Sequence, residues 1–126
     1  MNFSQIRKLF AVAALYDGFL GVLFLLIPGS VFYLFSITPP NHFGYVQFSA
    51  ALLIIFGLMF LKIALDPREN ASLILYGILL KISYCGLTFY YWFGEGIPWI
   101  WKPFAIFDLI MLVLFIWAAM TLREKS

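Results

Sequence analysis

Three ionisable residues lie inside long apolar stretches of this sequence and are its strongest candidates for chemistry. Lys81 stands near the middle of the apolar run 76–92, and Asp17 and Asp108 each interrupt another apolar run. A cation at that depth in a bilayer costs roughly 3 kcal/mol or more unless it finds a partner. We therefore expect the ammonium of Lys81 to pair with the aspartates at the polar centre of a helical bundle.

Helix geometry predicts that these three side chains lie at similar depth. At about 1.5 Å of rise per residue, Asp17 and Lys81 lie roughly 15–20 Å from the membrane surface nearest the N-terminus, and Asp108 roughly 22 Å from it. A lysine stem reaches about 6 Å and can lean along the helix. Lys81 is therefore predicted to meet either acid or to lie between them.

Two carboxylates and one ammonium leave a local charge of −1, which a buried site tends to neutralise. We expect one acid, Asp108, to carry a proton or to accept a hydrogen bond from Tyr84 or Gln47. Such a cluster has two interpretations. It is a polar clamp that fixes the register of the helices, or it is a proton relay or a polar anchor for a lipophilic ligand.

The composition shows what kind of element must position these residues. Of 126 residues, 64% are hydrophobic and only 11% are charged, whereas about a quarter of a soluble domain is charged. A chain this small has too little interior to bury so much apolar surface in water. The sequence therefore predicts an integral membrane protein with the lipid bilayer as its first partner. Scattered basic residues and a net charge of +2 argue against nucleic acid.

Four apolar stretches are long enough to cross a bilayer as helices, which takes about 20 residues. They cover residues 6–27, 45–65, 72–93 and 103–122, and segments rich in Pro, Gly or polar residues separate them. A cleaved signal peptide is rejected for the first stretch, because it is long and contains Asp17. The prediction is an all-α, single-domain, up-and-down bundle of four transmembrane helices, with a short interfacial segment after the first.

Basic residues near the ends of the spans predict the orientation. With the N-terminus inside, the outer side holds only Lys102. The inner side then holds Arg7, Lys8, Lys62, Arg68, Arg123 and Lys125. We therefore expect both termini to lie in the cytoplasm.

Helical spacing predicts which side chains face the interior. The three stripes are Asp17, Gly21 and Phe24; Lys81, Tyr84, Cys85 and Thr88; and Asp108, Met111, Leu112 and Phe115. Small residues let helices approach closely, and we expect Gly18, Gly21, Gly57 and Gly86 at helix contacts. The only cysteine, Cys85, is expected to be a small apolar filler.

Aromatic residues gather in the connections on the predicted outer side. Those around the last connection are Tyr90, Tyr91, Trp92, Trp99 and Trp101. One interpretation is an interfacial belt, in which the rings lie in lipid and the polar tips reach the headgroups. The other is a stacked aromatic cup for a flat ligand or a partner subunit, which would explain why the outer side is richer in aromatics than the inner side.

The sequence contains no motif for catalysis, for a metal or for a bound cofactor. We therefore expect a non-enzymatic protein that binds a lipophilic molecule, such as a lipid or a quinone-like ligand, or that serves as an accessory subunit of a larger membrane complex. One alternative is an oligomeric small transporter or proton-conducting protein that uses the intramembrane Asp and Lys residues. Another is an intramembrane enzyme that acts on a lipid or quinone.

The segment Tyr16-Asp17-Gly18-Phe19-Leu20-Gly21 and the Ile-Pro pairs at Ile27-Pro28 and Ile97-Pro98 resemble small bacterial four-helix membrane proteins of the DoxX-like kind. The resemblance covers the layout of the whole chain rather than a specific motif. It implies a single four-helix domain in a bacterial inner membrane, and it transfers no catalytic residue onto this sequence.

Overall fold

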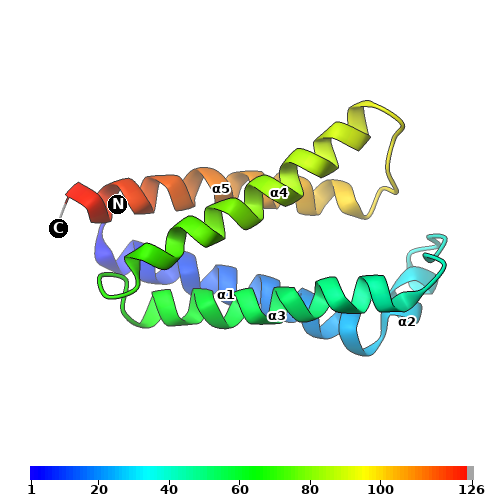
Figure 1. The fold of residues 1–126 in the computed structure, drawn as a ribbon, viewed down its shortest axis with the longest axis horizontal. Helices are drawn as coiled ribbons and strands as arrows, with labels where there is room; N and C mark the ends of the chain where they lie inside the picture. The colour runs from blue at the N-terminus through cyan, green and yellow to red at the C-terminus, as the bar shows by residue number, and fades with distance from the viewer. Residues whose placement is uncertain (125–126) are drawn as a thin grey trace.

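The computed structural model describes residues 1–124, which form an all-α, up-and-down bundle (Figure 1). The helices are α1 (Phe3–Leu26), α2 (Pro28–Leu34), α3 (Phe43–Leu65), the single 3-10 turn η1 (Ala71–Leu73), α4 (Ile74–Phe93) and α5 (Trp101–Glu124). The N-terminus and the C-terminal end of α5 lie at one end of the bundle, the terminal end; α2 and the α4–α5 loop lie at the far end. Lys125, one of the predicted inner basic residues, lies outside the described residues.

Four segments are long and apolar enough to cross a membrane: α1, α3, η1 with α4, and α5. They carry large apolar side chains on their outer surfaces. Leu15 and Phe19 of α1, for example, are 75% and 66% exposed. Apolar surface of this extent is typical of a chain whose solvent is lipid. The protein is a small integral membrane protein with the predicted four-helix fold.

Local sequence explains where the helices begin and end. Asn2 and Gln5 form a capping box at the start of α1, with the Gln5 N–H donating to Asn2 Oδ1 at 2.8 Å and the Asn2 N–H to Gln5 Oε1 at 2.9 Å. Pro28 ends α1, because proline disfavours the helical conformation in the residue before it, and it opens the first turn of α2. In the α4–α5 loop, Gly96 has a φ of 92°, a conformation that glycine adopts easily.

A histidine caps the N-terminus of α3. The Gly44 N–H donates to Nδ1 of His42 at 2.8 Å. We expect His42→Ala to lower the free energy of unfolding by about 1 kcal/mol, the usual value of a lost N-cap, and His42→Asn to retain most of it. Thermal unfolding of the detergent-solubilised protein measures the difference. A His42→Ala protein as stable as wild type would show that this bond does not stabilise the helix.

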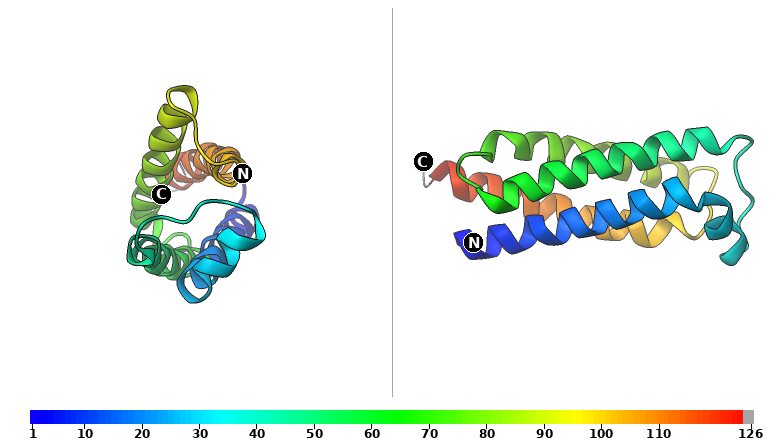
Figure 2. Two further views of the ribbon diagram at one scale, coloured as in Figure 1. Left: turned by 90° about the vertical axis from the view of Figure 1, so that its right-hand side faces the viewer. Right: turned by 90° about the horizontal axis from the view of Figure 1, so that it is seen from below.

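The four spanning helices form two antiparallel pairs, α1 with α3 and α4 with α5 (Figure 2). Glycines bring α1 and α3 close together. A Cβ on Gly21 would stand 2.7 Å from the carbonyl oxygen of Ala50, and one on Gly57 would stand 3.2 Å from the Cα of Gly18. Gly21 and Gly57 therefore lie at a helix contact, as predicted. Gly18 takes part through its backbone, which Gly57 approaches, and no described atom lies within 4 Å of the place where a Cβ on Gly18 would be.

The prediction that Gly86 lies at a helix contact is wrong. No described atom lies within 4 Å of the place where its Cβ would be, because α4 leans away from the rest of the bundle toward the far end (Figure 1). Instead, Gly77 near the start of α4 faces the ring of Phe60, whose Cε1 would be 2.7 Å from an added Cβ. The sequence shows a small residue in a helix but not the tilt of that helix.

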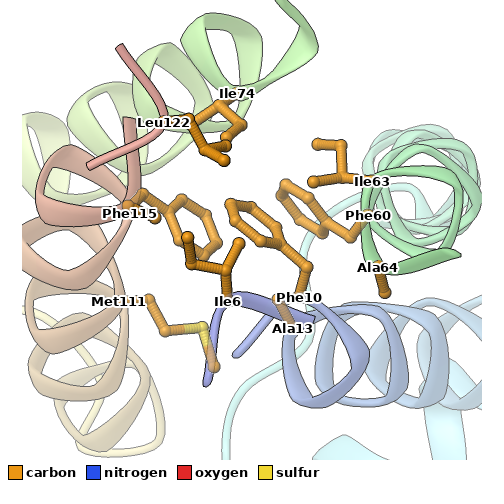
Figure 3. Packing of buried hydrophobic residues seen from close by; sticks show 11 residues of the cluster. Ile6, Phe10, Ala13, Phe60, Ile63, Ala64, Ile74, Met111, Phe115 and Leu122 are labelled. Atoms are coloured by element: carbon orange, nitrogen blue, oxygen red, sulfur yellow. The ribbon is translucent and has the colours of Figure 1, made fainter. Parts of the chain in front are cut away.

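Buried apolar side chains form two clusters inside the bundle, one toward each end. The terminal-end cluster consists of Ile6, Phe10, Ala13, Phe60, Ile63, Ala64, Ile74, Met111, Phe115, Ala118 and Leu122 (Figure 3). The ring of Phe10 contacts those of Phe60 and Phe115, with centroids 6.0 and 4.7 Å away. The far-end cluster is smaller and consists of Phe24, Val31, Phe32, Ala50 and Ile100. The three intramembrane ionisable residues come from helix turns between these two clusters.

Candidate functional site

Asp17, Lys81 and Asp108 belong to α1, α4 and α5, and each lies on the buried stripe of its helix. Ala13 and Gly21 precede and follow Asp17 on this stripe, because residues three or four apart share one helix face. The exposed fractions of the three ionisable residues are 1%, 0% and 7% in chain order. All three are therefore shielded from lipid, as the cost of an exposed charge in hydrocarbon requires.

The ammonium of Lys81 bridges the two carboxylates. Nζ donates to Oδ1 and Oδ2 of Asp17 at 3.1 and 3.0 Å, and to Oδ1 of Asp108 at 3.1 Å. Both contacts are ion pairs. An ammonium has three donor hydrogens, and three acceptor oxygens surround this one. We call these three side chains the charge triad; the structure brings them together as predicted.

Aromatic rings also approach the ammonium. Nζ of Lys81 lies 5.6 Å from the centroid of the Tyr16 ring and 5.8 Å from that of Phe60. Ring faces attract cations at such distances. Phe60 belongs to the terminal-end cluster as well. The charge triad is therefore in direct contact with packed side chains on its terminal side.

A pocket of about 460 Å³ lies between the charge triad and the far end. Its volume falls within the range of small-molecule sites, roughly 300–1,000 Å³. The lining residues are Tyr16, Asp17, Leu20, Phe24, Tyr45, Val46, Ser49, Ala50, Leu52, Leu53, Leu80, Tyr84, Trp101, Phe104 and Asp108. Both acids of the charge triad are among them and Lys81 is not. A molecule in the pocket would therefore meet the carboxylates of the triad.

The pocket has an aromatic wall and reaches the outer surface of the bundle. The Trp101 ring lies 5.7 Å from the Phe24 ring and 6.4 Å from the Phe104 ring, measured between centroids. Tyr45 and Leu52 of α3 line the pocket too, and they are 75% and 38% exposed. The pocket therefore extends from the charge triad to the apolar surface of α3.

Two tyrosine hydroxyls add polar groups to the lining residues. The Tyr84 hydroxyl donates to the Trp101 carbonyl at 3.1 Å. The Tyr16 hydroxyl is buried and has no hydrogen-bond partner among residues 1–124, and its ring packs edge-on against Phe104 and Phe107. Buried polar atoms in folded proteins are nearly always paired. The Tyr16 hydroxyl is therefore an exception among the described residues.

No protein family, curated protein or solved structure matches this chain. The resemblance to DoxX-like proteins stays a prediction, and the chemistry of the site rests on its geometry. That geometry supports two roles. The charge triad ties α1, α4 and α5 together through one ammonium, and it presents carboxylate oxygens to an apolar pocket.

Of the two predicted ways of neutralising Asp108, a hydrogen bond from Gln47 or Tyr84 is wrong, and a proton on its carboxyl group stays a prediction. Gln47 Nε2 donates to the Leu25 carbonyl at 3.1 Å, and the Tyr84 hydroxyl donates to the Trp101 carbonyl. Leu25 lies in the last turn of α1, where carbonyls lack a partner within the helix and accept from side chains. Asp108 accepts from the lysine instead.

The five aromatic residues predicted as an outer cluster do not form one cup. Among the described residues, the ring contacts join Tyr90 to Tyr91, Trp92 to Phe89 and Phe93, Trp99 to Phe35, and Trp101 to Phe24, Phe32 and Phe104. Tyr90 and Trp99 are 73% and 52% exposed, as residues of an interfacial belt are. Of these five residues, only Trp101 lines the pocket.

Sequence reasoning missed several residues that shape the pocket, and spacing from the charge triad is the signal that finds some of them. Leu20 follows Asp17 by three positions, and Phe104 precedes Asp108 by four. Residues at these spacings share a helix face. Ser49 and Leu53 of α3 also line the pocket, but α3 carries no triad residue that marks its inner face. Cys85 is buried with its thiol 3.7 Å from the Ala105 carbonyl, in keeping with a small filler.

Proposed function

We propose that this integral membrane protein binds a lipophilic molecule, such as a lipid or a quinone-like ligand, whose polar head meets the charge triad. The pocket carries the proposal. Most of its lining is apolar, and Asp17 and Asp108 lie together at the end nearest Lys81. Small-molecule sites are typically apolar concavities with a few convergent polar groups. The proposed role is non-enzymatic, and it suits an accessory subunit that supplies such a molecule to a larger complex.

The proposed orientation places both termini in the cytoplasm of a bacterium. The terminal end carries Arg7, Lys8, Lys62, Arg68 and Arg123, whereas the far end carries Lys102. Short loops on the cytoplasmic side of the inner membrane are enriched in basic residues. The pocket then lies in the outer half of the bilayer, and the ligand enters through the apolar surface beside Tyr45 and Leu52.

A proton-conducting protein is the second candidate, because intramembrane charges mark ion pathways by default. The terminal-end cluster weighs against it. Ile6, Phe10 and Phe115 are each 0% exposed and lie between the charge triad and the terminal end. Packed apolar side chains give water no polar partners there. Equal proton flux into liposomes that contain wild type, Asp17→Asn or Lys81→Met would remove this candidate.

Native mass spectrometry of the gently solubilised protein tests the binding function. We expect wild type to retain one lipophilic molecule per chain and Ser49→Trp to lose it, because Ser49 lines the pocket and an indole there would fill it. Ser83→Trp is the matched control. Each serine is exposed and donates to the carbonyl four residues earlier, at 3.2 Å for Ser49 and 2.8 Å for Ser83, but Ser83 is not among the lining residues.

The pair of variants separates occupancy of the pocket from lipid adsorbed to the outer surface. Adsorbed lipid would persist in both variants, since neither removes apolar surface. Wild type without any bound molecule, or Ser49→Trp that retains as much as Ser83→Trp, would contradict the proposal.

A further inference from the structure

All charged side chains that line the pocket are acidic. Asp17 and Asp108 line it, no Lys or Arg of residues 1–124 does, and Lys81 is fully buried behind them. In a low-dielectric surrounding, the sign of the nearest charges decides which head groups are stabilised. The lining therefore distinguishes cationic, neutral and anionic ligands.

The charge triad has acceptor capacity left over. With both carboxylates ionised it carries a charge of −1, and the ammonium has its three acceptors already. Asp108 gives only Oδ1 to the lysine, and Oδ2 has no hydrogen-bond partner among the described residues. A carboxylate oxygen away from water is stabilised by a donor, and most by a charged one. Oδ2 of Asp108 is therefore the atom on which a ligand head would be held.

The wall of the pocket favours the same sign of charge. Phe24, Trp101 and Phe104 line it, and their rings pack together as a group. The face of an aromatic ring carries partial negative charge and attracts ammonium groups. The aromatic wall and the two lining aspartates thus both favour a cationic ligand.

We infer that the pocket selects a lipophilic amine in its protonated form. The ammonium head donates to Oδ2 of Asp108 and brings the site to two positive and two negative charges, while the apolar body lies along the aromatic wall. This inference rests on the proposed binding function and specifies the head group of the ligand. It also explains why one lysine is placed between two acids rather than opposite a single one.

Three probes with one naphthyl body and different heads test the inference: 2-(1-naphthyl)ethylamine, 2-(1-naphthyl)ethanol and 1-naphthylacetate. Equilibrium dialysis at neutral pH against purified protein in detergent, with empty micelles as the reference, measures the three affinities. We expect the amine to bind about tenfold more tightly than the alcohol. Both heads can donate a hydrogen bond to the Asp108 carboxylate, but only the ammonium adds the attraction of opposite charges. The carboxylate should bind most weakly.

One variant and one control test whether the preference for the amine comes from the charge triad. Asp108→Asn should bring the ratio of amine to alcohol affinity close to one, because it removes the extra negative charge while keeping the size of the side chain. Glu95→Gln removes one negative charge from an exposed residue of the α4–α5 loop that does not line the pocket. It should leave the ratio as in wild type; a fall there would assign the effect to net charge.

The outcomes separate failure of this inference from failure of the proposed function. If none of the probes binds above the micelle reference and native mass spectrometry finds no bound molecule, the binding function itself fails. If the alcohol binds as tightly as the amine in wild type, the pocket binds lipophilic molecules but the inference is overturned. In that case a proton on Asp108 balances the charge triad in place of the ligand.

Discussion

Replacing Lys81 with methionine should destabilise the bundle more than any other single substitution in the charge triad. The lysine is 0% exposed and is the cation that both Asp17 and Asp108 contact. Methionine keeps much of the apolar stem but leaves two carboxylates buried without a counter-charge. Breaking a buried ion pair by removing one partner costs about 3–5 kcal/mol. Thermal unfolding in detergent can be monitored as the loss of monodisperse protein after heating. It should show a correspondingly large fall in Tm.

We expect replacement of one acid to cost less stability than replacement of Lys81, and replacement of all three residues to restore stability. Asp17→Asn or Asp108→Asn leaves one carboxylate facing the ammonium, so the remaining pair is neutral. The triple variant Asp17→Asn/Lys81→Met/Asp108→Asn contains no buried charge and should recover most of the stability that Lys81→Met loses, since neutral replacements of whole buried ionic groups are often tolerated. A triple variant as unstable as Lys81→Met would mean that the loss comes from packing of the lysine stem.

The charge triad was predictable from the sequence because the energy of a buried charge is large compared with other effects. A lone ammonium at the bilayer centre has few ways to avoid its desolvation cost, and the acids of other spans are the partners within reach. Helical spacing then determines the rest of the inner stripe. Gly21 follows Asp17 by four positions and Phe24 follows Gly21 by three, and both are buried on the face that Asp17 turns inward.

The pocket and the tilt of α4 were not predictable in the same way. Apolar residues cover every face of a transmembrane helix, so a pattern of polarity does not show which face meets a neighbour. Nothing in the sequence distinguishes Gly86, which faces open space, from Gly77, which faces Phe60. The acceptors of Gln47 and Tyr84 were also assigned wrongly, because backbone carbonyls compete with side chains as acceptors and are far more numerous.

Alanine in place of Gly21 should separate α1 from α3 and weaken the far half of the bundle. Its Cβ would lie 2.7 Å from the Ala50 carbonyl oxygen and 3.0 Å from the Ile54 backbone nitrogen. Backbone atoms cannot move aside as the end of a flexible side chain can, so the helices must move apart. Overpacking of this kind costs about 1–3 kcal/mol. The Tm of Gly21→Ala in detergent should fall accordingly.

Gly86→Ala is the matched control, because it makes the same chemical change in another spanning helix where nothing lies within 4 Å of the new Cβ. It should be neutral or raise the free energy of unfolding by up to about 1 kcal/mol, since alanine favours the helix more than glycine does. Equal effects of the two variants would mean that α1 and α3 do not approach as closely as Gly21 requires. Ala50 also lines the pocket, so a real separation at Gly21 should reduce the retained lipophilic molecule together with the stability.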